Sequence, residues 1–166
     1  MEFRKSIVVD KSIDQVWEVL GNQYAEAYRW ASGLYHSKGK GAPVLQGATC
    51  DQRVCETDFG TVREKLRTLD AENYVLSYEV MEGFPFFVDT GVNNWKLTPE
   101  AGSTRVDIHL VITTKGFVGS VMSPMLKWQM NKVLDNVLSD FKYYIEVGNP
   151  SPRKLAEMAK SQKKAA

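Results

Sequence analysis

Alternating apolar and polar positions dominate the first two thirds of the chain. The alternation has a period of two residues, which places successive side chains on opposite faces of a strand. The links between the strands are short and carry turn residues, as in TDFG, DAEN and PEAG, so successive strands are expected to be antiparallel neighbours. The pattern predicts seven strands, at residues 2–10, 33–38, 48–56, 60–69, 73–82, 89–98 and 103–114.

Two short segments between the first and second strands have helical character instead. Residues 13–20 follow Ser12, which with Gln15 forms the S-x-x-Q pattern of a capping box. Residues 22–31 are rich in aromatic residues and alanine, and Gly33 ends them. The sequence therefore predicts two short helices before the second strand.

The longest helical pattern lies near the end of the chain and covers residues 124–147. Ser123 fits an N-cap with Pro124 at the first helical position, and Gly148 and Pro150 stop the helix. A helix of this length spans roughly 36 Å at about 1.5 Å per residue, enough to cross a small domain. Its apolar positions fall on one stripe: Met122, Leu126, Met130, Val133, Leu134, Val137, Leu138, Phe141, Tyr144 and Ile145.

This order of elements predicts an α+β fold. A sheet with one apolar face must cover that face, and the last helix is the element long enough to do so. We expect a curved seven-stranded antiparallel sheet, with the two short helices and the long C-terminal helix enclosing a cavity. Residues 1–148 should form this one domain, and residues 149–166 a basic, flexible tail.

Composition excludes several classes of function. The net charge of +1 offers no electrostatic case for binding nucleic acid. No apolar run reaches the roughly 18 residues of a membrane span, and charged residues interrupt any signal-peptide pattern at the N-terminus, so no integral membrane association is expected.

The cysteines and histidines indicate neither a disulfide nor a metal site. Cys50 and Cys55 are five residues apart in one predicted strand and should lie on opposite faces. His36 and His109 are too far away in sequence to complete a metal set. We therefore expect free thiols, no metal, no cofactor and a cytoplasmic location.

Four parts of the chain resemble a known superfamily. They are SIDQVWEVL near the start, GATCDQR, TVREKLRTLDAENYVLSYEV in the middle, and the long final helix. Over residues 2–147 the chain resembles START-like proteins, and its middle segment is most similar to the polyketide cyclase and dehydrase (SRPBCC) branch. The resemblance implies a helix-grip fold whose cavity holds a small hydrophobic molecule: a lipid, a polyketide or an aromatic metabolite.

Counting residues back from each turn places polar side chains opposite one another. From the TDFG turn, Arg53 lies opposite Glu64, and from the DAE turn Glu64 lies opposite Tyr78. From the PEAG turn, Asn93 lies opposite Ile108. The sequence thus predicts a row of Arg53, Glu64 and Tyr78 across neighbouring strands.

The row should face the long helix, because Glu64 shares its face with Val62 and Leu66. A carboxylate there is costly without a partner, and Arg53 is the obvious one. Two interpretations remain open. Arg53 and Glu64 could form an ion pair that satisfies two polar groups in a wet cavity. Alternatively, Glu64, Arg53 and Tyr78 are catalytic, with Glu64 as a base, as the resemblance to lachrymatory-factor-type enzymes implies.

Further apolar and amide side chains are candidates for the cavity wall. Trp95 has a second interpretation as a plain core residue. The predicted ligand-binding set is Arg53, Glu64, Tyr78, Asn93, Trp95, Ile108, Met130, Val137 and Phe141.

Three classes of function follow from this sequence. The first is a binding or transport module for a small hydrophobic ligand, and the second is a cyclase, dehydratase or isomerase working by acid–base chemistry. The third is a protein-interaction module, which the polar residues on the apolar face disfavour. Trp128 lies off the apolar stripe of the helix, where it could meet the domain rim or a partner, so a weak homodimer also stays open.

Overall fold

The computed structural model describes residues 1–57 and 59–165, with the side chains of those up to residue 160. It forms one seven-stranded sheet in the order β1-β7-β6-β5-β4-β3-β2, with every neighbouring pair antiparallel. The predicted α+β helix-grip fold is confirmed. The strands are β1 (Glu2–Val9), β2 (Leu34–Lys40), β3 (Gln52–Thr57), β4 (Gly60–Asp70), β5 (Val75–Glu82), β6 (Val88–Glu100) and β7 (Ser103–Thr114).

Three short helical pieces connect β1 to β2 where two were predicted. They are α1 (Ile13–Trp17), a π-helical turn η1 (Glu18–Asn22) and a 3₁₀ helix η2 (Tyr24–Arg29). The capping box at the start of α1 is present, because Ser12 N donates to Gln15 Oε1 at 3.2 Å and Gln15 N donates to Ser12 Oγ at 3.5 Å. These pieces pack Trp17, Leu20 and Tyr24 into the core at one end of the sheet.

The long helix α2 (Gly116–Val147) starts at Gly116, earlier than the predicted position 124. Pro124 is therefore an interior residue of the helix and not its first residue. The helix tolerates it because Pro124 is exposed, so the carbonyl that loses its partner can bond to water. The end of the helix is as predicted, since Gly148 takes the left-handed conformation, with φ of 81°.

The segment expected to be a flexible tail contains a further helix, α3 (Pro152–Ala165). Residue 166, which that expectation includes, lies outside the described residues. The carboxylate of Asp140 on α2 joins α3 to the body, because it accepts hydrogen bonds from Ser151 Oγ at 2.5 Å, Arg153 Nη1 at 3.2 Å and Ser32 N at 3.1 Å. These contacts are polar, so no apolar stripe in the sequence indicated them.

A second set of contacts ties α3 to the start of β2. Lys154 is buried, its Nζ donates to the carbonyl of Leu34, and the carboxylate of Glu157 accepts from Gly33 N at 2.9 and 3.1 Å. Burial lowers the pKa of Lys154, while Glu157 and Asp140 act in the opposite direction. Helix α3 is thus held beside the η2–β2 connection.

Strand register was predicted correctly for one hairpin and was wrong by two residues in two others. Arg53 lies opposite Glu64, as expected. Tyr78 lies opposite Leu66 instead of Glu64, and Asn93 lies opposite Leu110 instead of Ile108. The β6–β7 error comes from its turn, which has two residues. The β4–β5 turn has four residues and shifts the pairing by three, and an irregularity between Leu66 and Thr68 reduces that shift to two at Tyr78. A shift of two residues leaves every side chain on its predicted face.

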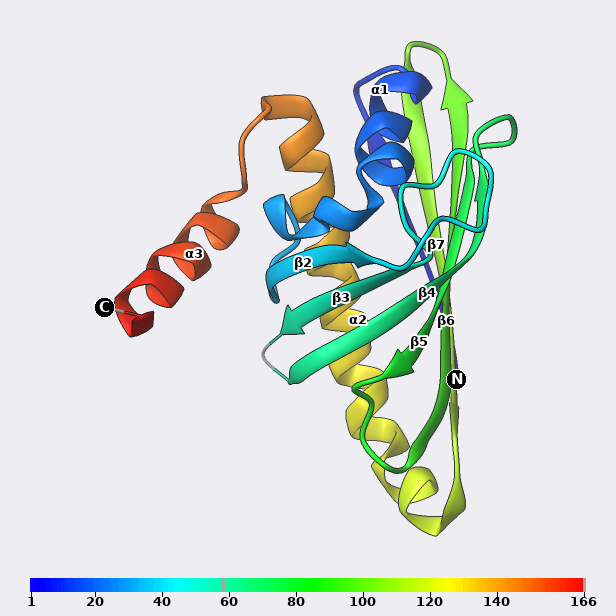
Figure 1. The fold of residues 1–166 in the computed structure, drawn as a ribbon, viewed down its shortest axis with the longest axis vertical. Helices are drawn as coiled ribbons and strands as arrows, with labels where there is room; N and C mark the ends of the chain where they lie inside the picture. The colour runs from blue at the N-terminus through cyan, green and yellow to red at the C-terminus, as the bar shows by residue number, and fades with distance from the viewer. Residues whose placement is uncertain (58, 166) are drawn as a thin grey trace.

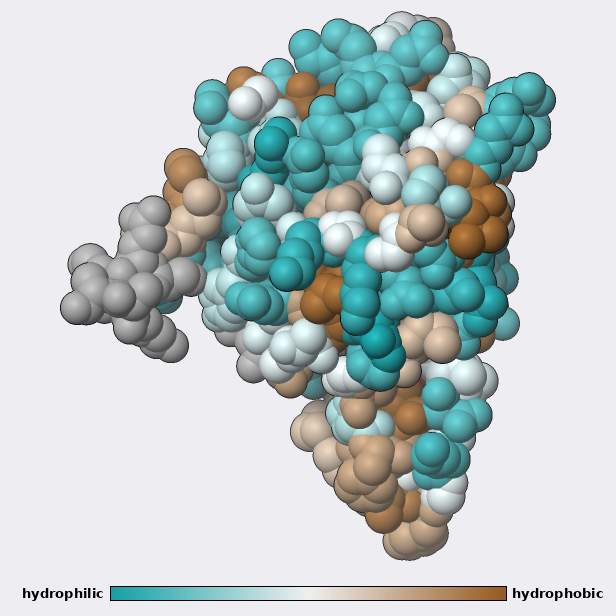
Figure 2. All heavy atoms as spheres, viewed as in Figure 1, coloured by the Kyte–Doolittle hydropathy of each residue, from teal (hydrophilic) through white to brown (hydrophobic). Residues whose placement is uncertain are grey.

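Helix α2 crosses the concave side of the sheet, and its sheet contacts are mainly with β1 and then β7 (Figure 1). Trp30, Trp95 and Phe141 form a cluster of edge-to-face rings there, with centroids 4.8–6.5 Å apart. The first turns of α2 extend past the sheet beside the β5–β6 loop, and apolar side chains gather at that tip in Figure 2. Exposed apolar side chains of these two segments are Phe86, Phe117, Val118, Val121 and Met125.

Candidate functional site

A cavity of about 910 Å³ lies between α2 and the strands β3 to β6. Its walls are largely apolar and include Leu76, Leu110, Val133 and Val137. The volume falls within the range of pockets that enclose small organic ligands, roughly 300–1,000 Å³. Exposed residues of α2, the β3–β4 turn and α3 form the mouth of the cavity: Trp128, Lys132, Phe59 and Arg153.

Seven of the nine predicted ligand-binding residues line this cavity. They are Arg53, Glu64, Tyr78, Asn93, Trp95, Met130 and Val137.

The other two, Ile108 and Phe141, belong to the hydrophobic core. The prediction was wrong for them because α2 is in direct contact with the sheet at that end. Phe141 lies 4.8 Å from Trp30 and 5.7 Å from Trp95, measured between ring centroids, which leaves no room for a ligand there.

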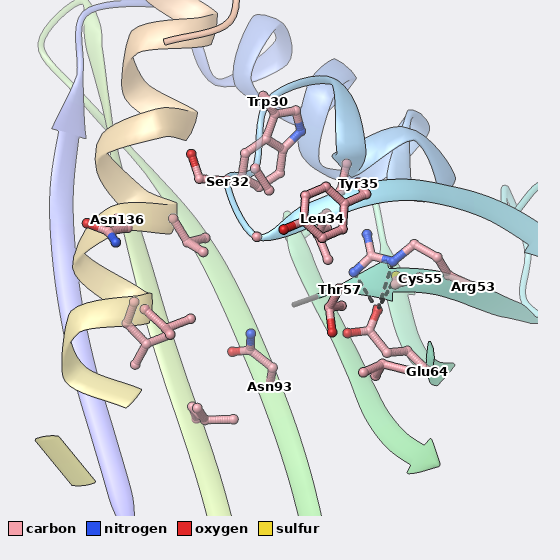
Figure 3. A pocket seen from close by; sticks show the side chains of 18 of the residues that line it. Trp30, Ser32, Leu34, Tyr35, Arg53, Cys55, Thr57, Glu64, Asn93 and Asn136 are labelled. Carbon is pink, nitrogen blue, oxygen red and sulfur yellow. Dashed lines mark hydrogen bonds and ion pairs between the residues drawn. The ribbon is translucent and has the colours of Figure 1, made fainter. Parts of the chain in front are cut away.

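The predicted pair of Arg53 and Glu64 is a buried ion pair on the cavity wall (Figure 3). Arg53 Nε and Nη2 both donate to Glu64 Oε2, at 2.8 and 2.5 Å. Arg53 Nη1 donates to the carbonyl of Tyr24 at 2.6 Å. The two side chains are 6% and 11% exposed, so each depends on the other for its charge.

Two tyrosine rings hold the guanidinium of Arg53 in place. Its central carbon lies 4.3 Å from the ring centroid of Tyr24 and 5.2 Å from that of Tyr78, which is cation–π distance. Burial alone would lower the pKa of Arg53, but the negative charge of Glu64, together with smaller contributions from Tyr24, Cys55 and Tyr78, raises that pKa well above its ordinary value. Arg53 therefore keeps its charge and its orientation.

Tyr78 is the predicted third member of the row, and it lies diagonally across from Glu64. Its hydroxyl oxygen accepts a hydrogen bond from Asn93 Nδ2 at 2.9 Å. Burial, and then the negative charge of Glu64, raise the pKa of Tyr78 to about 12. Tyr78 therefore remains a phenol at neutral pH, and its proton can serve as a donor.

Cys55 also faces this cluster, with its Sγ 3.8 Å from Glu64 Oε2. Burial raises the pKa of the Cys55 thiol to about 12. A thiol that stays protonated is a poor nucleophile, so Cys55 is not suited to covalent catalysis at neutral pH. Cys50 lies just before β3 rather than inside it, and both cysteines are free.

Several buried polar atoms around the cavity have no hydrogen-bond partner within the described part of the chain. They are Tyr24 Oη, Trp30 Nε1, Ser32 Oγ, Asn93 Oδ1 and Trp95 Nε1, and all five residues line the cavity. Folded proteins rarely leave such atoms unpaired, so each is a place where a bound ligand or a water molecule can complete a hydrogen bond. Sequence reasoning missed Tyr24 and Trp30, whose signal was the aromatic content of the second short helix.

Metal-ion and membrane-spanning features are both absent from the described residues. No three His, Cys, Asp or Glu side chains there are grouped closely enough to hold a metal ion. The helices of that part of the chain include none that is long and apolar enough to cross a membrane.

A curved antiparallel sheet, a long helix across it and a cavity between them define the START-like, helix-grip class. The chain belongs to the family described as polyketide cyclase/dehydrase and lipid transport, whose model matches residues 1–146. No curated protein matches the sequence.

Solved structures share the fold at low sequence identity. A protein from Nitrosospira multiformis is 20% identical, with a TM-score of 0.69, and the match covers 87% of this chain and 96% of that one. A START superfamily protein from Mycobacterium smegmatis is 14% identical, with a TM-score of 0.63 and coverage of 82% and 93%. Ara h 8.0201 is 13% identical, with a TM-score of 0.58 and coverage of 87% and 97%. At these identities the likeness concerns the fold alone.

Proposed function

We propose that this protein binds a small hydrophobic molecule, such as a lipid, a polyketide or an aromatic metabolite, in the cavity between α2 and the sheet. The observation that carries the proposal is the cavity of about 910 Å³, whose walls are mostly apolar and which has a few buried polar groups at one end. Apolar walls supply the driving force for binding, and the polar groups orient the ligand. The family to which the chain belongs supports the same function.

A second candidate function is an enzyme of the cyclase, dehydratase or isomerase type. One observation favours it: the Tyr78 hydroxyl proton and an unbonded oxygen of Glu64 lie in the same cluster on the cavity wall. Glu64 would accept a proton from the substrate, while Tyr78 would donate a hydrogen bond to the developing negative oxygen. Arg53 would act as a positioning residue for Glu64.

Ligand binding can be tested with substitutions on α2 that fill the cavity. The double variant Val133→Trp/Val137→Trp places two large rings one turn apart on the cavity wall. We expect it to weaken the binding of an apolar fluorescent dye at least about tenfold from a micromolar-range affinity. The matched control is Val147→Trp, on an exposed turn at the end of α2, and it should bind the dye like the wild type.

Wild-type protein that binds no apolar dye would contradict the proposal. So would a double variant that binds as tightly as the control while remaining folded by circular dichroism. Native mass spectrometry of protein from its own cells should show a retained small molecule, and this identifies the ligand.

Incubation of the protein with this retained molecule distinguishes an enzyme from a carrier. An enzyme converts it to a new mass or isomer, and Glu64→Gln slows that conversion by at least about a hundredfold. A carrier returns the molecule unchanged, however long the incubation lasts.

We also propose a cytoplasmic location. Its support is that both cysteines, Cys50 and Cys55, are free in the structure, which suits a reducing compartment.

A further inference from the structure

The two oxygens of the Glu64 carboxylate have different surroundings. Oε2 accepts both hydrogen bonds from Arg53, at 2.8 and 2.5 Å, and contacts Cys55 Sγ at 3.8 Å. Oε1 has no hydrogen-bond partner in the part of the chain that the structure describes, although Glu64 is only 8% exposed. Figure 3 shows this arrangement, with both dashed lines ending on one oxygen of Glu64. A charged acceptor is thus left for a molecule in the cavity.

A second acceptor and two donors surround the same end of the cavity. Asn93 Oδ1 is a buried acceptor without a partner, because Asn93 bonds to Tyr78 through its nitrogen. Tyr24 Oη has no partner, and the Tyr78 proton is free to donate. A hydroxyl group is both donor and acceptor, so one hydroxyl can donate to Glu64 and accept from a tyrosine.

The charge at this end of the cavity excludes an acid. Arg53 is the positively charged side chain buried among these groups, and Glu64 already neutralises it through two hydrogen bonds. A ligand carboxylate or phosphate placed beside Glu64 would meet a like charge in a poorly solvated space. A purely apolar ligand would leave Glu64 Oε1 unbonded, which is costly for a charged group.

We infer that the ligand is uncharged and carries a hydroxyl group, phenolic, enolic or alcoholic, that donates a hydrogen bond to Glu64 Oε1. This inference rests on the proposed binding function and narrows it to a chemical class. The apolar body of the ligand lies along Leu76, Leu110 and Val137, and its hydroxyl end lies at the Arg53–Glu64 pair.

Three probes of one shape test this selectivity at pH 7. They are 2-naphthol, 2-methylnaphthalene and 2-naphthoate, which are a neutral donor, an apolar isostere and an anion. A hydrogen bond to a charged group predicts that 2-naphthol binds roughly ten- to a hundredfold more tightly than 2-methylnaphthalene. We expect 2-naphthoate to bind more weakly than both.

The variant Glu64→Gln should reverse the order of the two polar probes. It keeps the shape of the side chain but removes its charge, so the charge of Arg53 is no longer neutralised. We expect 2-naphthoate to gain at least about tenfold in affinity and 2-naphthol to lose a similar factor. The control is Glu79→Gln, which makes the same change in the pair of Glu79 with Arg67, on the face of β5 opposite Tyr78. It should leave all three affinities unchanged.

Each result has a defined meaning. If all three probes bind the wild type and 2-naphthol shows no preference, the hydroxyl inference is wrong and the binding function stands. If no probe binds, the binding function itself is overturned. Should Glu64→Gln fail to fold, the double variant Arg53→Met/Glu64→Leu replaces it, and this variant should lose the naphthol preference without gaining affinity for 2-naphthoate.

Discussion

The space between α2 and the sheet is filled on one side and hollow on the other. Next to β1 and β7, side chains of the helix are in direct contact with the strands, and Phe141 packs with Trp30 and Trp95. Next to β3, β4 and β5, the helix stands away from the strands, and the cavity with its Arg53–Glu64 pair occupies the gap. The concave face of the sheet therefore packs against α2 on one side and lines the cavity on the other.

The difference shows where stability and binding are located. The filled side buries large apolar side chains, which stabilise the fold. The hollow side holds charged and polar groups whose burial is costly, and the packing on the other side offsets that cost. We therefore expect the truncation of apolar side chains to cost more stability on the filled side than on the hollow side, where the loss of one buried charge is the costly change.

The largest effect should come from Phe141→Ala on the filled side. Phe141 is fully buried in the ring cluster, so its loss leaves a void in contact with Trp30 and Trp95. We expect the free energy of unfolding to fall by about 4 kcal/mol, measured by urea denaturation. Tyr143→Ala, on the exposed side of the same helix, is the control and should cost much less. A loss of under about 1 kcal/mol for Phe141→Ala would mean that this side is not filled.

The next largest loss of stability should come from removing one charge on the hollow side. Arg53→Met leaves Glu64 buried without its partner, and we expect a loss of about 3 kcal/mol in the free energy of unfolding at neutral pH. The double variant Arg53→Met/Glu64→Leu removes both charges and should recover most of that loss. If the double variant is less stable than Arg53→Met, the ion pair makes a net contribution to the stability of the fold.

Alkaline pH should lower the stability of the protein through two groups on the hollow side. The pKa values of Cys55 and Tyr78 are both raised to about 12, so the folded protein keeps protons that the unfolded chain loses above about pH 9 and 10. Stability therefore falls as pH rises between pH 9 and 12, by up to about 1.4 kcal/mol per pH unit for each group.

Chemical denaturation at a series of pH values measures this slope. The variants Cys55→Ala and Tyr78→Phe should each flatten it. Phe141→Leu, a change on the filled side, should lower stability at every pH and leave the slope unchanged. A slope that is the same in all of these variants would refute the assignment of the two pKa values.

The smallest effect should come from Met130→Ala. Met130 lines the cavity and is only partly buried, so its side chain leaves little new void when it is shortened. We expect a cost of about 1 kcal/mol or less, against about 3 kcal/mol for Leu138→Ala on the filled side. Thermal unfolding of the two variants side by side measures the difference. Equal costs would remove the distinction between the two sides.

The sequence predicted the polar pair because that prediction depends on local geometry. Arg53 and Glu64 flank one tight turn, so counting residues sufficed to place them opposite each other. The pairing of Asn93 was wrong by two because the length of its turn was misjudged. The pairing of Tyr78 was wrong by two because a misjudged turn and an irregularity within β4 add up. Both shifts are even, so both side chains lie on the predicted face.

The position of the cavity could not be predicted in the same way. Ile108 and Val137 have similar apolar patterns in the sequence, yet only Val137 lines the cavity. What separates them is the distance between α2 and each strand, which depends on the whole fold. Helix α3 was missed for a related reason, because single polar contacts made by Asp140, Lys154 and Glu157 hold it rather than an apolar face.

The size of the cavity also has a consequence for its solvent. A space of about 910 Å³ is far larger than one water molecule needs, so it has room for many of them. A hydrophobic ligand that enters the cavity then displaces many water molecules. Because apolar surface is buried, binding should give a negative change in heat capacity. The balance of enthalpy and entropy in that exchange will shift with temperature, so the same ligand can bind with released heat when warm and with little heat when cold.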